Sequence, residues 1–122
     1  MVKIVIMDWE SFNKMVHSDI KNAVKTGSFK KQGDIIYAET LESALRLFTP
    51  ERMKLLSAVK ASKPASLYAL AKLLKKDFKT IFTDANYLSN AGIMALETYK
   101  EGARTKVRPR FSGGKISLEI PV

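Results

Sequence analysis

The sequence of residues 49–92 is TPERMKLLSAVKASKPASLYALAKLLKKDFKTIFTDANYLSNAG, and its pattern predicts three consecutive helices. Thr49 can accept a backbone N–H as the N-cap, Pro50 fits the first helical position, and Glu51 suits the positive end of a helix. Apolar residues then recur every three positions until Pro64, which lacks a backbone donor and restricts its predecessor. The first helix is therefore expected to end before Pro64.

Two more helices are predicted after this proline. Ser66 offers a second N-cap, and apolar residues follow it at positions i, i+3, i+4 and i+7. These residues are Leu67, Leu70, Ala71 and Leu74. A basic turn at residues 75–77 leads to the third helix, whose apolar stripe is expected to be buried and consists of Phe78, Ile81, Ala85 and Leu88. Gly92 can adopt the left-handed conformation that ends a helix.

The segments after Gly92 are predicted to be extended. Residues 93–99 and 104–111 are β-like and are separated by a turn at residues 100–103, and residues 112–114 form another turn. Residues 116, 118 and 120 are apolar and alternate with polar or small residues in a last strand. The order helix, helix, helix, hairpin, strand is that of a winged helix-turn-helix, which we expect over residues 49–122.

The first 48 residues are predicted to form a strand–helix extension. Residues 2–7 suit a strand, Asp8 can cap the next segment, and helical spacing runs from Phe12 to Ile20 towards a helix stop at residues 26–27. Residues 28–33 are polar and basic and predict a loop, residues 34–38 predict a second strand, and residues 41–48 predict one or two amphipathic turns. The predicted fold class is therefore α+β, a winged helix-turn-helix with an N-terminal strand–helix extension over residues 1–48.

The composition limits the class of protein. A chain of 122 residues with 46% hydrophobic residues suits one compact domain. The absence of cysteine excludes disulfides, iron–sulfur clusters and thiolate zinc sites, and it agrees with the reducing conditions of a cytoplasmic protein. The apolar run at residues 4–7 is too short for a membrane span or a signal-peptide core, so we expect no membrane partner.

Positive charge is concentrated in the second part of the chain. The chain has 21 Lys and Arg against 12 Asp and Glu, a formal net charge of +9. Residues 1–48 hold 7 basic and 6 acidic side chains, whereas residues 49–122 hold 14 basic and 6 acidic ones. Such a segment can neutralise the phosphates of a nucleic acid, although lysine-rich faces also serve solubility alone.

The third helix would enter the major groove of double-stranded DNA in this architecture. Its outward residues and the turn before it supply Lys76, Lys79, Thr80, Thr83, Asn86 and Tyr87. Lysine, threonine and asparagine can contact base edges or phosphates, but they can also simply solvate an exposed helix face. Phe82 lies beside the apolar stripe, and we expect it to pack in the core rather than contact a base.

Alternating basic residues mark the second strand of the hairpin. They are Arg104, Lys106, Arg108 and Arg110. An extended strand would point all four to one face, where like charges repel unless a phosphate backbone compensates them. Guanidinium groups also fit phosphate bidentately and insert into a narrow minor groove. This row favours a DNA-contacting wing over a solvated strand edge.

No catalytic or metal site is predicted, and we expect no cofactor and no enzymatic activity. His17 is the only histidine, and a single histidine on a helix is more often structural than catalytic. Asp8 and Glu10 lie near a strand end where a nuclease would hold Mg²⁺, but helix capping is the simpler interpretation. The sequence shows no pair of exposed aromatics on a sheet of the kind that binds RNA.

Three segments resemble the MarR/ArsR-like winged-helix family of small predicted transcriptional regulators. They are residues 47–56 (Leu-Phe-Thr-Pro-Glu-Arg-Met-Lys-Leu-Leu), residues 66–74 (Ser-Leu-Tyr-Ala-Leu-Ala-Lys-Leu-Leu) and residues 88–93 (Leu-Ser-Asn-Ala-Gly-Ile). The similarity covers about residues 34–122. Members often resemble antitoxins encoded beside a small toxin, including toxins of the TumE type. The resemblance thus implies repression of the protein's own operon and neutralisation of a cognate toxin.

The sequence departs from this family at two places. Residues 82–84 are Phe-Thr-Asp where the family often carries arginine or histidine, and Asp84 would be unfavourable near a phosphate, so the wing is expected to carry more of the binding. Residues 1–33 match no part of the family and are nearly neutral, which makes them the better candidate for contact with a partner. We therefore expect a homodimeric DNA-binding regulator that reads an inverted repeat, with toxin neutralisation through residues 1–48 as the alternative.

Overall fold

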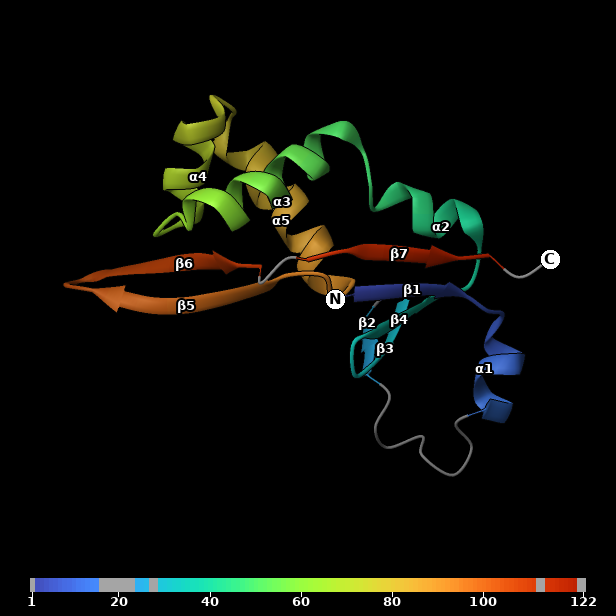
Figure 1. Ribbon diagram of the computed structural model, residues 1–122. Coiled ribbons are helices and arrows are strands. Elements are labelled where there is room, and N and C mark those ends of the chain that lie inside the picture. Colours follow the sequence, from blue (N-terminus) through green and yellow to red (C-terminus); the bar gives the residue numbers. More distant parts are fainter. Residues whose placement is uncertain (1, 16–23, 27–28, 112–113, 121–122) are drawn as a thin grey trace.

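The computed structural model describes residues 2–15, 24–26, 29–111 and 114–120. These residues form a mixed α+β structure, which confirms the predicted class at that level. Figure 1 shows a β-sheet near the two ends of the chain, the helices α3, α4 and α5 grouped together, and a hairpin that projects away from the sheet.

The sheet combines strands from both ends of the chain. It consists of β1 (Val2–Ile6), β2 (Val24–Thr26), β3 (Phe29–Gln32), β4 (Ile35–Ala38) and β7 (Ile116–Glu119), in the order β2-β3-β4-β1-β7. β1 pairs in parallel with both β4 and β7, whereas β3 pairs antiparallel with β2 and β4. The strands predicted at residues 2–7, 34–38 and 116–120 are confirmed. The last strand joins the sheet of the N-terminal segment.

The loop predicted at residues 28–33 is wrong, because Phe29–Gln32 forms strand β3. The Phe29 side chain is buried in the core, which an exposed loop would not provide. Gly33 adopts a φ of +61° in the turn between β3 and β4, a conformation that glycine reaches without steric cost. A basic strand with one buried aromatic lacks the regular alternation that identifies strands in a sequence.

Two short helices flank the sheet, α1 (Trp9–Met15) and α2 (Leu41–Arg46). The predicted cap of α1 is present: the Asp8 carboxylate accepts hydrogen bonds from the backbone N and the Oγ of Ser11 at 3.0 and 2.8 Å. These hydrogen bonds from Ser11 lower the pKa of the Asp8 carboxyl from its ordinary value. The predicted continuation of this helix to Ile20, and also His17, lie outside the described residues. The expectation that the helical segment reaches a stop at residues 26–27 is wrong, because Val24–Thr26 forms strand β2.

The three helices predicted at the centre of the chain are confirmed as α3 (Pro50–Ser62), α4 (Leu67–Leu74) and α5 (Phe78–Asn90). Thr49 Oγ1 accepts a hydrogen bond from the backbone N of Arg52 at 3.2 Å, and Ser66 Oγ accepts one from the backbone N of Ala69 at 3.0 Å. Both predicted N-caps therefore satisfy backbone donors that a helix start leaves free.

A hairpin follows the helices, formed by β5 (Ala95–Glu101) and β6 (Arg104–Arg110). The two strands agree with the extended segments predicted from the sequence, but the turn is shorter than expected and is centred on Gly102 and Ala103. Gly102 has a φ of +63°. The Tyr99 hydroxyl donates to the backbone O of Ala65 at 2.6 Å and thereby ties β5 to the connection between α3 and α4.

One hydrophobic core joins the sheet to the helices. Ile4 and Ile36 from the sheet are buried in the same cluster as Leu55 from α3 and Leu88 from α5. This continuous core crosses the predicted boundary between residues 48 and 49. The division into an extension over 1–48 and a domain over 49–122 stays a prediction.

Candidate functional site

The outer face of α5 and the turn before it present lysine and threonine side chains, as predicted. Lys76, Lys79, Thr80 and Thr83 are all exposed. Within the described part of the chain, neither lysine forms an ion pair. Their charges are therefore available to an anionic partner.

Two polar residues of this face bond to their own helix. Thr83 Oγ1 donates to the backbone O of Lys79 at 2.9 Å, and Asn86 Nδ2 donates to the backbone O of Phe82 at 2.8 Å. Either side chain would have to give up this hydrogen bond and rotate outward to contact a base. Both residues lie where the sequence placed them, but neither is preorganised for base contact.

The outward orientation expected for Tyr87 is wrong. Tyr87 is partly buried and packs against the core, and the Arg52 guanidinium lies over its ring at 4.1 Å from the centroid. Arg52 Nε also donates to Asp84 Oδ1 at 3.2 Å, and the two side chains are only 16% and 17% exposed. Arg52 therefore compensates the charge of Asp84 within the contact between α3 and α5, so the expected repulsion of phosphate by Asp84 is reduced.

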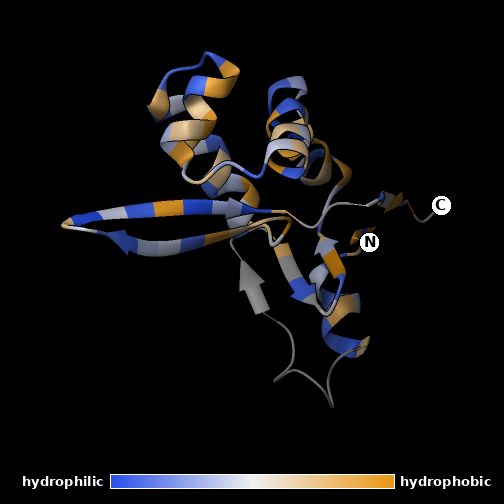
Figure 2. Ribbon diagram, turned by 60° about the vertical axis from the view of Figure 1, so that its left-hand side comes forward, coloured by the Kyte–Doolittle hydropathy of each residue, from blue (hydrophilic) through white to orange (hydrophobic). Residues whose placement is uncertain are grey.

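The cations of β6 share a hairpin face with acidic residues of β5, and Figure 2 shows that both strands are mostly hydrophilic. The antiparallel register places Glu97 opposite Arg108. Glu97 Oε2 lies 2.7 Å from Nε of Arg110, and Glu97 Oε1 lies 3.7 Å from Nη1 of Arg108. The expectation that a phosphate backbone compensates this row is therefore wrong for two of its arginines, because Glu97 already pairs with both of them.

The other two cations of the row differ from each other. Lys106 Nζ lies 3.2 Å from Oε1 of Glu101 in a third ion pair. Arg104 is exposed next to the hairpin turn, and it forms no ion pair among residues 2–15, 24–26, 29–111 and 114–120. Arg104 is thus the cation of the row that is most available to a ligand.

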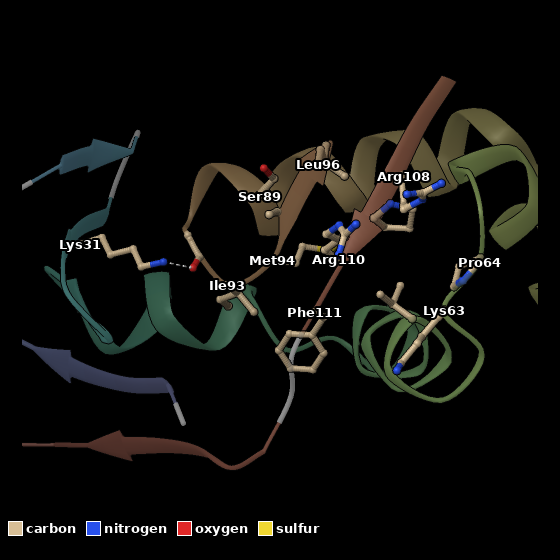
Figure 3. A pocket seen from close by; sticks show the side chains of 14 residues that line it. Lys31, Lys63, Pro64, Ser89, Ile93, Met94, Leu96, Arg108, Arg110 and Phe111 are labelled. Carbon is tan, nitrogen blue, oxygen red and sulfur yellow. Dashed lines mark hydrogen bonds between the residues drawn. The ribbon is translucent and has the colours of Figure 1, made fainter. Parts of the chain in front are cut away.

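A cavity of about 940 Å³ lies between the base of the hairpin and the ends of α3 and α5. Figure 3 shows Lys31 at one end of this cavity, Lys63 and Arg108 towards the other end, and Arg110 between them. Lys31 Nζ donates to the backbone O of Gly92 at 2.9 Å. The cavity therefore extends the basic surface of β6 towards the C-terminal end of α3.

Two phenylalanines that were expected to be buried are exposed instead. Phe78 is 42% and Phe82 is 45% exposed, whereas Ile81, Ala85 and Leu88 of the predicted stripe are buried. Helical spacing assigned Phe78 to the stripe, but it could not show that the first turn of α5 leaves this ring uncovered. A relevant signal in the sequence is the spacing of four between the two phenylalanines, which brings both rings to one side of the helix.

The described residues contain no group of three or more His, Asp or Glu side chains that could hold a metal ion. No helix among them is long and apolar enough to span a membrane. The expectation that the protein has no enzymatic activity stays a prediction.

Comparison with known proteins identifies a family. Residues 47–118 match the family HVO_A0114, so the chain belongs to this family. The matched segment contains α3, α4, α5 and the hairpin. No curated protein and no solved structure matches the chain significantly.

Proposed function

We propose that this protein is a transcriptional regulator that binds double-stranded DNA through a winged helix-turn-helix. α4 and α5 are the paired helices, α5 is the recognition helix, and the hairpin of β5 and β6 is the wing. The order of these elements supports this interpretation, as does the resemblance of the sequence to MarR/ArsR-like regulators. The regulator is proposed to be a homodimer that represses its own operon from an inverted repeat.

The observation that carries the proposal is a set of unpaired cations on both of the elements that would face DNA. Lys76 lies in the turn before α5, Lys79 lies in the first turn of α5, and Arg104 lies next to the tip of the hairpin. No ion pair of these three side chains occurs in the part of the chain that the structure describes. Unpaired surface cations at the start of a recognition helix and at a wing tip suit contact with two stretches of one phosphate backbone.

Titration of the full-length protein against a fluorescent duplex from its own promoter tests this proposal. We expect binding at or below micromolar protein, with an affinity that falls as the salt concentration rises. A duplex with one half of the inverted repeat scrambled should bind more weakly than the intact repeat. The absence of salt-sensitive binding at micromolar protein would overturn the proposal.

A second candidate function is the neutralisation of a cognate toxin through residues 1–48. The observation that favours it is an exposed apolar pair, Leu41 and Leu45, which are one turn apart on α2. This segment carries little net charge, so the pair suits contact with another protein rather than with DNA.

Co-expression with the product of a neighbouring gene tests this second function. The variant Leu41→Asp/Leu45→Asp should lose co-purification with a toxic neighbour and should fail to relieve growth arrest, while it retains DNA binding. These point substitutions are preferable to a deletion of residues 1–48, because β1 pairs with both β4 and β7. Full neutralisation by the double variant would contradict the assignment.

A further inference from the structure

Three exposed aromatic side chains form a cluster at the junction of α4 and α5. Tyr68 is 60% exposed, and its ring centroid lies 6.1 Å from that of Phe78, which in turn lies 5.8 Å from that of Phe82. Moving a large aromatic ring out of water is favourable. A cluster of exposed aromatic rings marks a binding surface more often than a single exposed residue does.

The aromatic cluster forms one wall of a groove of about 360 Å³. The segment of β6 from Arg104 to Val107 also lines the groove, together with Ser66 and Leu67. A volume of this size is at the lower end of the range for small-molecule pockets, roughly 300–1,000 Å³. The groove is therefore large enough for a flat group of the size of a nucleobase.

The groove combines aromatic rings with positive charge. Arg104, which forms no ion pair among the described residues, and Lys106, which pairs with Glu101, line the groove. Lys72 Nζ lies 4.8 Å from the centre of the Tyr68 ring. None of the described residues that line the groove is acidic. A second copy of this chain is an unsuitable occupant for a basic groove, because each copy carries a net charge of +9.

We propose that this groove binds the unpaired bases of single-stranded DNA. Stacking on aromatic rings and neutralisation of the backbone by nearby cations are the two means by which proteins hold single strands without reading their sequence. The proposal rests on the proposed function, because Arg104 and Lys106 belong both to the groove and to the wing. DNA held by the wing would reach the aromatic cluster wherever its strands are separated.

Anisotropy titrations with four probes of one promoter sequence test the proposal: the full duplex, the same duplex with a central bubble of mismatches, the single DNA strand, and the corresponding RNA strand. Wild-type protein should bind the bubble duplex about tenfold more tightly than the full duplex at equal salt. The variant Phe78→Leu/Phe82→Leu keeps apolar side chains but removes the stacking rings. It should lose this preference and leave binding of the full duplex unchanged.

The matched control is Leu73→Ala, which shortens another exposed apolar side chain of α4 that does not line the groove. Leu73→Ala should keep the wild-type affinities for the bubble duplex and for the full duplex. Thermal unfolding of each variant checks that the variant is folded. Equal affinity of wild-type protein for bubble and full duplex, or a preference that survives in the double variant, would overturn the inference. Failure to bind any duplex would instead overturn the proposed function.

Three results would assign the groove to another occupant and thereby overturn the inference. The first is tighter binding of the RNA strand than of the DNA strand. The second is a lower molecular mass of the double variant in light scattering, which would assign the groove to a second copy. The third is that wild-type protein binds an acidic amphipathic peptide more tightly than bubble DNA and that the double variant no longer binds this peptide.

Discussion

The segment that opens α5, with Lys76 in the preceding turn and Lys79 in the first turn, and the strand β6 both carry cations but differ in where their acidic partners lie. On α5, Asp84 is largely buried and pairs with Arg52. Neither Lys76 nor Lys79 forms an ion pair with a described acidic residue, and this includes the neighbouring Asp77. On the hairpin, Glu97 lies on the same surface as the arginines and pairs with two of them. The number of cations in a segment is therefore a poor measure of its attraction for DNA unless the acidic partners are located.

This comparison moves the proposed DNA contact away from the middle of the hairpin. The sequence favours the row on β6 as the main binding element. The ion pairs of the structure make the start of α5 and the hairpin tip at Arg104 better candidates for DNA contact. The positive charge of these two regions is not compensated by an ion pair among the described residues.

The largest expected effect is on stability and concerns the two kinds of ion pair. Arg52→Ala should lower the free energy of unfolding by about 2 kcal/mol, because Asp84 would stay mostly buried without its charged partner. Arg110→Ala should cost less than about 0.5 kcal/mol, because its pair with Glu97 is exposed to water. Urea denaturation measures both values. Equal losses in the free energy of unfolding would show that the buried pair of Asp84 and the exposed pair of Glu97 do not differ in their contribution to stability.

The next effect concerns the arginines held by Glu97. Glu97→Gln should steepen the dependence of log affinity for duplex DNA on log salt concentration by about 1, because it frees the equivalent of one cation. Glu10→Gln, which removes the same charge from α1 outside the proposed interface, is the control. The hairpin arginines would have no role in DNA binding if the slope of Glu97→Gln stayed at the wild-type value.

A smaller effect should separate two arginines of the same strand. Arg104→Ala should reduce the salt slope by about 1, whereas Arg108→Ala should reduce it by less than about 0.5. The reason is that Arg108 already lies near Glu97 and 4.6 Å from the centre of the Tyr99 ring. Anisotropy titrations over a series of salt concentrations give both slopes. A larger decrease for Arg108→Ala would reverse the assignment within the wing.

Local signals in the sequence predicted most of the elements. The caps at Thr49 and Ser66 depend on residues within three positions, and the apolar spacing of Ile81, Ala85 and Leu88 depends on one helix. These features are determined within a single turn or a single element, so the sequence alone was sufficient to place the three helices.

The parts that could not be predicted depend on contacts between distant residues. The pairing of Glu97 with Arg110 follows from the register of two strands, and the contact between α3 and α5 joins Arg52 to Asp84, 32 positions further along the sequence. The exposure of Phe78 depends on what surrounds the first turn of α5. Periodicity within one helix carries no information on these two ion pairs or on the exposure of Phe78.

The central claim is that unpaired cations on α5 and at the hairpin tip hold duplex DNA. The salt dependence of binding by Lys79→Ala/Arg104→Ala tests it most directly, with Lys14→Ala/Lys54→Ala as a control that removes the same charge from α1 and α3. The first variant should reduce the slope of log affinity against log salt concentration by about 2, and the control should leave it nearly unchanged. Equal reductions in the two variants would contradict the claim, because they would show that only the net charge of the protein matters.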